Sequence, residues 1–452
     1  MATIFAPATA PGRAGIAVIR LSGPAAGAAV AALASELPSP RRATRRRLRS
    51  PDGGTVLDDA LVLWFPGPAS YTGEDGAELH LHGGLAVVAA VMDALAGLPG
   101  LRPAEPGEFS RRAFHNGKLD LTAVEGLADL IAAESESQRR QALRQLDGVL
   151  AALYDGWRHD LAQALAHVEA AIDFSDEDLP DTIVDRVRHT IEGVHSGISL
   201  HLDDNHRGER LRDGLFVAIV GAPNVGKSSL LNRLARRDAA IVSDLAGTTR
   251  DVIEVHMDLG GLPVTVADTA GLRDGADAQT GADPIEAEGM RRSLARAEAA
   301  DLKIAIFDAT AWPETDQRTR ALVDDDTLVA INKTDMASLP AGMTLGAREV
   351  WPLSCTTGHG FDAFVAALSE AAAARLQPSG TPALTRARHR SALTECADAL
   401  ARYPLAAAPE LAAPELAAEE LRLAMRALAR ITGRVDVEDL LEVIFSEFCI
   451  GK

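Results

Sequence analysis

Apolar and polar residues follow four successive patterns along the chain, and each pattern predicts its own kind of architecture. In residues 1–118, short β-branched runs stand between Gly/Pro turns, with one helical stretch near Leu85–Leu95. This mixture is typical of an α+β domain. The predicted strands are Ile16–Leu21, Ala60–Trp64 and Ala77–Leu81.

Residues 119–211 have a helical pattern instead. Long stretches lack Pro and Gly, and apolar residues recur every three or four positions, as they do at Leu146, Leu150, Leu153 and Trp157. The same texture returns near Arg386 and continues through the last segment, residues 377–452. We therefore expect long helices in both regions.

Residues 215–376 alternate apolar strands with loop-forming residues and helices, which is the order of a parallel, doubly wound sheet. Because helical segments flank this α/β unit on both sides, the economical explanation is a discontinuous helical domain (119–211 and 377–452) that carries the unit as an insertion. The predicted strands of the unit are Phe216–Val220, Val264–Ala267, Ile304–Phe307, Leu328–Ile331 and Val350–Leu353.

Composition and charge narrow the function classes. A chain of 452 residues predicts two to four domains, and 47% apolar with 24% charged residues is normal for soluble globular proteins. A net charge of −19 argues against a protein that coats nucleic acid through dense basic surface. It still allows a nucleic-acid substrate that is met by a local patch or presented by a partner. We interpret the densest basic run, Arg41–Arg49, as a solvated loop between two strands.

Cysteine usage and hydropathy point to the cytoplasm. Cys355, Cys396 and Cys449 are too widely spaced for a disulfide framework or a paired metal motif. The chain start lacks a basic region followed by a long apolar run, and no stretch approaches the ~20 apolar residues that span a bilayer. A cytosolic protein is therefore the default expectation.

A phosphate-binding loop follows the first strand of the α/β unit. Gly221–Ser228 fits G-x-x-x-x-G-K-[ST], with an apolar strand before it and a helical run after it. Its glycines let backbone N–H groups converge on phosphate oxygens, and the helix N-terminus favours negative charge. Lys227 would neutralise the β- and γ-phosphates, and Ser228 would ligate Mg²⁺. This motif predicts a nucleoside triphosphate without specifying the base.

Two further motifs complete a guanine-nucleotide site. Asp268–Gly271 (D-T-A-G) ends a strand, where Asp268 would face Mg²⁺ and the N–H of Gly271 would reach the γ-phosphate. Asn332–Asp335 (N-K-T-D) follows the next-but-one strand, and the Asp335 carboxylate can accept both the ring N–H and the exocyclic amine of guanine. Adenine would leave that charge unpaired, so a site built this way can reject it by roughly 10⁴-fold. Ser354–Thr356 would close over the base with backbone donors, although Cys355 stands where Ala is usual.

The residue that catalyses hydrolysis is less evident. Thr249, in the loop Gly247–Asp251, is well placed to complete the Mg²⁺ shell. Leu272 follows the D-T-A-G element where Ras-like enzymes carry a water-orienting Gln, and leucine cannot hydrogen-bond. Either hydrolysis is slow, or other groups supply the catalysis. Asn224 in the phosphate loop could help to coordinate a monovalent cation.

With these motifs in view, the whole chain resembles the MnmE (TrmE) family of tRNA-modification GTPases. The resemblance covers all three domains, and the closing F-C-I-G-K string, Phe448–Lys452, is a very specific ending. Beside Asn224 and the 247–251 loop, the strings that carry it are Ser70–Asp75, His82–Gly84, Pro106–Phe109, Asn116–Asp120 and Ile172–Phe174. The fold implied is an α+β N-terminal folate-binding domain (1–118), the discontinuous helical domain, and an inserted Ras-like P-loop G domain (215–376).

The resemblance implies a cytoplasmic homodimer joined through the N-terminal domain. With the FAD-dependent partner MnmG, in a heterotetramer or larger complex, it would add an aminomethyl or carboxymethylaminomethyl group to C5 of the wobble uridine in certain tRNAs. A 5-formyl- or methylene-tetrahydrofolate would supply the one-carbon unit. The implied folate contacts are Arg20, Glu78, Lys118 and Lys452. Arginine and lysine suit the carboxylates of the glutamate tail, and Glu78 suits the donor edge of the pterin.

The family is K⁺-activated, so K⁺ would supply charge where other GTPases use an arginine finger. The implied K⁺ ligands are Asn224, Ser243, Leu245 and Thr248, and the implied Mg²⁺ ligands are Ser228 and Thr249. The candidate catalytic residues are Glu286, with Glu288 as the fallback because the stretch 274–284 is longer than expected, and Arg250. The implied GTP-binding residues are Asn224, Val225, Gly226, Lys227, Ser228, Ser229, Ser243, Asp244, Leu245, Ala246, Gly247, Thr248, Thr249, Asp268, Thr269, Ala270, Gly271, Asn332, Lys333, Asp335, Ser354, Cys355 and Thr356.

Two functional hypotheses follow. The first is K⁺-stimulated GTP hydrolysis that drives a conformational cycle in a tRNA-modifying complex. The second is a slow GTPase switch that only docks a partner, and Leu272 motivates it. The thiol of Cys449 is either reactive or a small buried apolar group.

Overall fold

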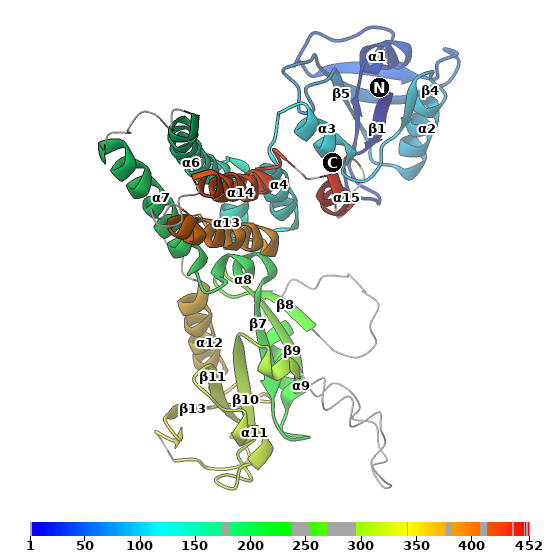
Figure 1. Ribbon diagram of the computed structural model, residues 1–452. Coiled ribbons are helices and arrows are strands. Elements are labelled where there is room, and N and C mark those ends of the chain that lie inside the picture. Colours follow the sequence, from blue (N-terminus) through cyan, green and yellow to red (C-terminus); the bar gives the residue numbers. More distant parts are fainter. Residues whose placement is uncertain are drawn as a thin grey trace, which may run out of the picture. The chain divides into compact units, whose positions relative to one another are not determined.

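The computed structural model describes residues 2–173, 181–236, 254–268, 295–340, 342–376, 382–406, 414–435, 438–446, 448 and 451. The chain divides into two compact units (Figure 1). The first unit comprises Met1–Ala128, Gln145–Ile183 and Arg402–Lys452, and the second comprises Asp129–Arg144 and Val184–Ala401.

A six-stranded sheet forms the core of the first unit. Its order is β3-β4-β5-β2-β1-β6, antiparallel except for the parallel pair β1–β6. The strands are β1 (Thr3–Pro7), β2 (Ile16–Ser22), β3 (Thr44–Arg49), β4 (Val56–Phe65), β5 (Gly76–His82) and β6 (Leu101–Pro103), and the helices are α1 (Ala26–Ala34), α2 (Leu85–Ala96) and α3 (Glu108–His115).

Side chains alternate between the two faces along each strand, and apolar residues at every second position bury one face of this sheet. On β4, Ala60, Val62 and Trp64 are buried in a cluster that includes apolar residues of α1 and α2, whereas Leu61 is 46% exposed on the other face. The three strands and the helix predicted from sequence are confirmed. The other elements of this α+β domain carry weaker patterns, because β1 and β6 are short and α1 is rich in alanine.

The interpretation of Arg41–Arg49 as a loop is wrong, because most of the run is strand β3. Leu48 is buried in the core, and Arg45 and Arg47 both pair with Asp59 on β4, at 3.4 and 3.2 Å. β3 lies at the edge of the sheet, where charged side chains are common. One buried leucine is too small a signal to reveal such a strand.

Helices that precede and follow the α/β sheet in the sequence also belong to the first unit. α6 (Val149–Asp173) packs against α14 (Pro414–Thr432), with Arg422 of α14 2.8 Å from Glu169 of α6. α4 (Leu121–Ala132) shares a cluster with α15 (Glu438–Ser446), in which Phe445 is buried. The residues of α5 (Glu136–Leu146) are divided between the two units, the second taking those up to Arg144 and the first taking Gln145 and Leu146.

A seven-stranded sheet forms the core of the second unit, in the order β12-β13-β11-β10-β7-β9-β8. The five central strands are parallel, and β8 and β12 are antiparallel at the two edges. The elements are β7 (Leu215–Val220), α9 (Lys227–Ala235), β8 (Glu254–Asp258), β9 (Pro263–Asp268), β10 (Leu302–Asp308), α11 (Gln317–Ala321), β11 (Thr327–Asn332), β12 (Thr344–Leu345), β13 (Arg348–Pro352) and α12 (Phe361–Leu376).

Both faces of this sheet are covered, as a doubly wound fold requires. Val217 and Ile219 of β7 pack in one cluster with α9 and α12, whereas Ala218 and Val220 pack in a second cluster on the other face. The five predicted strands are confirmed. The expectation of a helix after every strand is wrong for β11, which continues through a turn into the short hairpin β12–β13.

The remaining helices of the second unit are α7 (Asp181–Leu202), α8 (Arg207–Asp213) and the first part of α13 (Ala387–Ala406). Among these helices, residues that precede the α/β sheet in the sequence contact residues that follow it. Arg390 of α13 pairs with Asp204 at 2.6 Å and with Glu209 of α8 at 3.3 Å. Insertion of one domain into another remains a prediction, as do the bounds of the four predicted segments, 1–118, 119–211, 215–376 and 377–452.

A close approach at Gly208 of α8 generates a prediction about stability. A Cβ added to Gly208 would overlap the backbone carbonyl of Leu384, so Gly208→Ala must displace that segment. Such overpacking costs about 1–3 kcal/mol. We therefore expect a lower urea midpoint for the transition of this unit, followed by circular dichroism.

Gly193 of α7 is the matched control, because a Cβ there meets no atom within 4 Å. Gly193→Ala should raise the midpoint, since alanine favours a helix interior over glycine by about 1 kcal/mol. Equal midpoints for the two variants would contradict the packing at Gly208.

Candidate functional site

The phosphate loop lies between the end of β7 and the start of α9. Gly226 has a φ of 103°, in the left-handed region, and a Cβ there would overlap the side-chain amide of Asn332. The buried Lys227 ammonium donates to the carbonyls of Gly221 at 3.0 Å and Ala222 at 2.8 Å. A cation and a helix N-terminus thus converge on one loop, which is an arrangement that binds anions.

A pair of oxygen ligands lies beside the loop. The Ser228 hydroxyl, in the first turn of α9, donates to Asp268 Oδ2 at 2.8 Å. Asp268 ends β9, which pairs in parallel with β7, so the two strands bring these oxygens together. Hydroxyl and carboxylate oxygens are ligands that Mg²⁺ prefers, so this pair fits that ion.

The Asn332 side chain joins the phosphate loop to the loop 354–358. Its Nδ2 donates to Val225 O at 2.9 Å, and its Oδ1 accepts from Cys355 N, also at 2.9 Å. The exposed Asp335 carboxylate accepts from the Ser354 hydroxyl at 2.5 Å. The predicted N-K-T-D and S-C-T motifs therefore lie together, at the carboxyl ends of β11 and β13.

The side chains of Lys333 and Cys355 have different environments. Lys333 Nζ lies 2.6 Å from Asp308 Oδ2. Burial pushes the Asp308 pKa up, but the bonds from Lys333 and Thr310 hold it below its usual value, so this carboxylate is ionised at neutral pH. Burial raises the pKa of Cys355 to about 11, so its thiol stays protonated at neutral pH.

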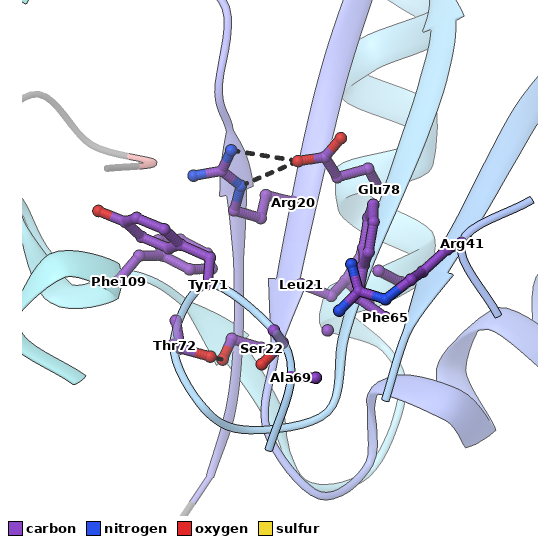
Figure 2. A pocket seen from close by; sticks show the side chains of 13 residues that line it. Arg20, Leu21, Ser22, Arg41, Phe65, Ala69, Tyr71, Thr72, Glu78 and Phe109 are labelled. Atoms are coloured by element: carbon purple, nitrogen blue, oxygen red, sulfur yellow. Dashed lines mark hydrogen bonds and ion pairs between the residues drawn. The ribbon is translucent and has the colours of Figure 1, made fainter. Parts of the chain in front are cut away.

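A pocket of about 250 Å³ opens in the first unit, beside strands β2 and β5 (Figure 2). Arg20 of β2 and Glu78 of β5 are paired by the sheet register, and their side chains form an ion pair at 3.1 Å. The Arg20 guanidinium lies 5.2 Å from the ring centre of Tyr71 and 5.9 Å from that of Phe109. Flat rings, a cation and an acceptor suit a conjugated heterocycle with hydrogen-bond donors.

The chain is similar to known proteins along its whole length. A family model described as "GTP-binding protein TrmE N-terminus" matches residues 3–118, and one described as "MnmE helical domain" matches residues 121–449. The tRNA modification GTPase MnmE of Rhodospirillum rubrum is 59% identical over 100% of this chain and 99% of that protein. The protein of the same name from Paramagnetospirillum magneticum is 58% identical, with the same coverage.

The chain belongs to the MnmE (TrmE) family of tRNA modification GTPases. A solved structure of Era from Aquifex aeolicus bound to GDP·AlF₄⁻ is 25% identical over 41% of this chain and 66% of that one. Its TM-score is 0.27, so this likeness adds nothing to the family assignment.

The folate contacts expected of an MnmE relative are only partly described. Arg20 and Glu78 line the pocket. Lys118 is exposed, and its Cε would lie 3.3 Å from a Cβ built on Gly73, so it is beside the loop that supplies Tyr71. Lys452 lies outside the described residues, although a Cβ on Gly451 would overlap the carbonyl of Pro7 in β1.

Part of the nucleotide site expected of the family also lies outside the described residues. Within them, Asn224, Ser229 and Thr356 are exposed on the phosphate loop, α9 and the 354–358 loop respectively. The predicted residues that are not described are Ser243, Asp244, Leu245, Ala246, Gly247, Thr248, Thr249, Arg250, Thr269, Ala270, Gly271, Glu286 and its fallback Glu288.

Some site residues were not apparent from the sequence. Asp308 ends β10 beside β11, so a carboxylate at the carboxyl end of a predicted strand was a usable signal. Tyr71 and Phe109 stand within the family strings 70–75 and 106–109, but their rings could not be placed around Arg20 without the fold. Arg233, which donates to Cys355 O, has no signal in the sequence.

Proposed function

We propose that this chain is a K⁺-stimulated GTP hydrolase that acts in tRNA modification. With MnmG it would add a carboxymethylaminomethyl or aminomethyl group at C5 of the wobble uridine of certain tRNAs. The observation that carries the proposal is the Asn332 bridge between the phosphate loop and the loop 354–358, in a chain related to MnmE over its whole length. That bridge joins the two halves of a guanine-nucleotide site.

The chain's own residues divide the work of binding GTP. Lys227 would exchange its carbonyl partners for the β- and γ-phosphates, because the new charge–charge contacts are stronger. Asp335 would exchange the Ser354 hydroxyl for the N–H and amine of guanine. Ser228, Asp268 and Thr249 would hold Mg²⁺, which when bound neutralises phosphate charge.

Hydrolysis would depend on residues around the phosphates other than a glutamine. Asn224 is exposed on the phosphate loop, and its carboxamide oxygen suits K⁺ together with Ser243, Leu245 and Thr248. The bound K⁺ would supply positive charge near the γ-phosphate. Glu286 would orient the attacking water, and Arg250 is the second candidate catalytic residue.

The first-unit pocket would bind a tetrahydrofolate derivative, the source of the one-carbon unit. Glu78 would accept hydrogen bonds from the pterin, and Tyr71 and Phe109 would contact its flat face. Lys118 and Lys452 would reach the glutamate carboxylates. We also propose a cytoplasmic homodimer joined through the N-terminal domain. Among the described residues, no helix has the length and apolar character needed to cross a bilayer.

The guanine assignment predicts a change of base specificity in Asp335→Asn. An asparagine offers one acceptor and one donor, so it mismatches the amine of guanine but complements the C2 carbonyl of xanthine. We expect the Kd for GDP to rise by at least about 100-fold and xanthosine diphosphate to become the better ligand.

Displacement of a fluorescent nucleotide measures both affinities. Asp325→Asn, at an exposed carboxylate that pairs with Arg348, is the matched control and should keep the preference for GDP. Unchanged base preference in Asp335→Asn would show that guanine is read elsewhere.

The cation assignment predicts that GTP turnover responds to the monovalent ion. We expect turnover in KCl to exceed that in NaCl by at least about tenfold, because a site whose oxygens fit K⁺ binds the smaller Na⁺ poorly and the positive charge near the transition state is then lost. Glu286→Ala should abolish turnover in either salt, and Asn224→Ala should remove the difference between salts. Slow turnover that ignores the cation would instead support a switch that only docks a partner.

The role in tRNA modification is tested in a strain that lacks this gene. Nucleoside mass spectrometry should show loss of C5-modified wobble uridine, restored by the wild-type chain and not by Glu78→Gln or Glu286→Ala. As a control, Glu78→Gln should keep the stability and the GTP affinity of the wild type, because the pocket and the nucleotide site lie in different units. A deletion strain with normal modification would refute the proposal.

A further inference from the structure

Arg233 reaches from the helix of the phosphate loop to the far side of the nucleotide site. It lies on α9, and its Nη1 donates to the carbonyl of Cys355 at 2.8 Å. Its guanidinium is also 5.1 Å from the ring centre of Phe361, the buried first residue of α12. One side chain therefore contacts the loop 354–358 and the helix that follows it.

The guanidinium of Arg233 lies very close to the loop 354–358. A Cβ on Gly358 would overlap the Nη2 group of Arg233, so that end of the guanidinium lies directly against the glycine. The loop is folded by its own bonds, from Gly358 N to Ser354 O at 2.8 Å and from Thr357 N to Ser354 Oγ at 3.1 Å. The forked guanidinium reaches the Cys355 carbonyl, Gly358 and the Phe361 ring at once, and a lysine ammonium, which is a compact point charge, does not reproduce all three contacts.

The contact acts on the peptide units that form the base side of the site. Asn332 holds the N–H of Cys355, and Arg233 holds the carbonyl of the same residue. Together they fix the two successive peptide planes on either side of Cys355. Asn332 ties these peptides to the phosphate loop, whereas Arg233 ties them to the helix that follows that loop.

We infer that Arg233 is a positioning residue for guanine: it holds the loop 354–358 in its nucleotide-binding conformation before the ligand arrives. Without it, part of the binding energy would be used to order that loop. The inference rests on the guanine-site assignment proposed above. Arg233 lies on the base side, so it should affect nucleotide affinity and leave the chemistry at the phosphates unchanged.

A helix-end cation can also stabilise a helix through its dipole, and the experiment must separate the two effects. Arg236 is the matched control, because it caps the same end of α9 and is exposed. The variants are Arg233→Met, Arg233→Lys and Arg236→Met in the full-length chain. The probes are GDP, GTP and pyrophosphate, which carries the phosphates without the base.

For Arg233→Met we expect the Kd for GDP and the KM for GTP to rise about tenfold, the effect of losing one charged hydrogen bond. The kcat at saturating GTP and the Kd for pyrophosphate should stay within about twofold. Arg233→Lys should recover only part of the GDP affinity, and Arg236→Met should behave as wild type.

Three outcomes would overturn the inference. If Arg233→Met binds GDP within twofold of wild type, the loop 354–358 does not need Arg233 to hold its conformation. An equal loss of GDP and pyrophosphate affinity, or the same loss in Arg236→Met, would show that Arg233 only stabilises α9. If Asp335→Asn keeps its guanine preference, the site assignment itself fails, which separates that failure from a failure of Arg233 alone.

Discussion

The nucleotide site depends on one buried carboxamide. Asn332 is 3% exposed, and it uses its donor towards Val225 and its acceptor towards Cys355, each at 2.9 Å. Hydrogen bonds gain strength where water is excluded, and leaving either partner unmatched would cost about 1–3 kcal/mol. Aspartate has no donor for Val225, and leucine has neither function. Loops that follow three separate strands are thus held in one arrangement by a single side chain.

The first unit supports its pocket differently, with a chain of buried charges. Arg112 of α3 lies 2.9 Å from both Glu74 and Glu108, and Ser22 joins Glu74 to Thr72 of the pocket wall. Burial alone would raise the pKa of Glu108, but bonds from Arg102, Glu105 and Arg112 bring it to about 2. Glu108 therefore stays ionised throughout the physiological pH range. Removing one member would leave a buried charge unpaired, which is far costlier than losing a surface ion pair.

Sequence was most informative where one motif adjoins one strand. Asp268 and Asn332 each end a parallel strand, and Lys227 begins the helix after the loop that follows β7. The carboxyl ends of parallel strands meet at one edge of the sheet, so these motifs lie together. Strand β3 escaped detection because its pattern of arginines resembles a solvated run. Arg233 and Tyr71 escaped for another reason. Their partners, Cys355 and Arg20, are distant in sequence, and neither contact leaves a periodic or local trace.

The packing of the chain's last segment has a consequence for synthesis. A Cβ on Gly107 would lie 2.6 Å from the carbonyl of Phe445, and Phe445 and Phe448 cover apolar residues of α4. Residues that precede the α/β sheet thus obtain part of their cover from residues that are translated after the whole of that sheet. Domains usually fold in order as they leave the ribosome. Here the N-terminal sheet can form early, but its surface around α3 and α4 stays open to water, and to chaperones, until Phe445 and Phe448 have been translated.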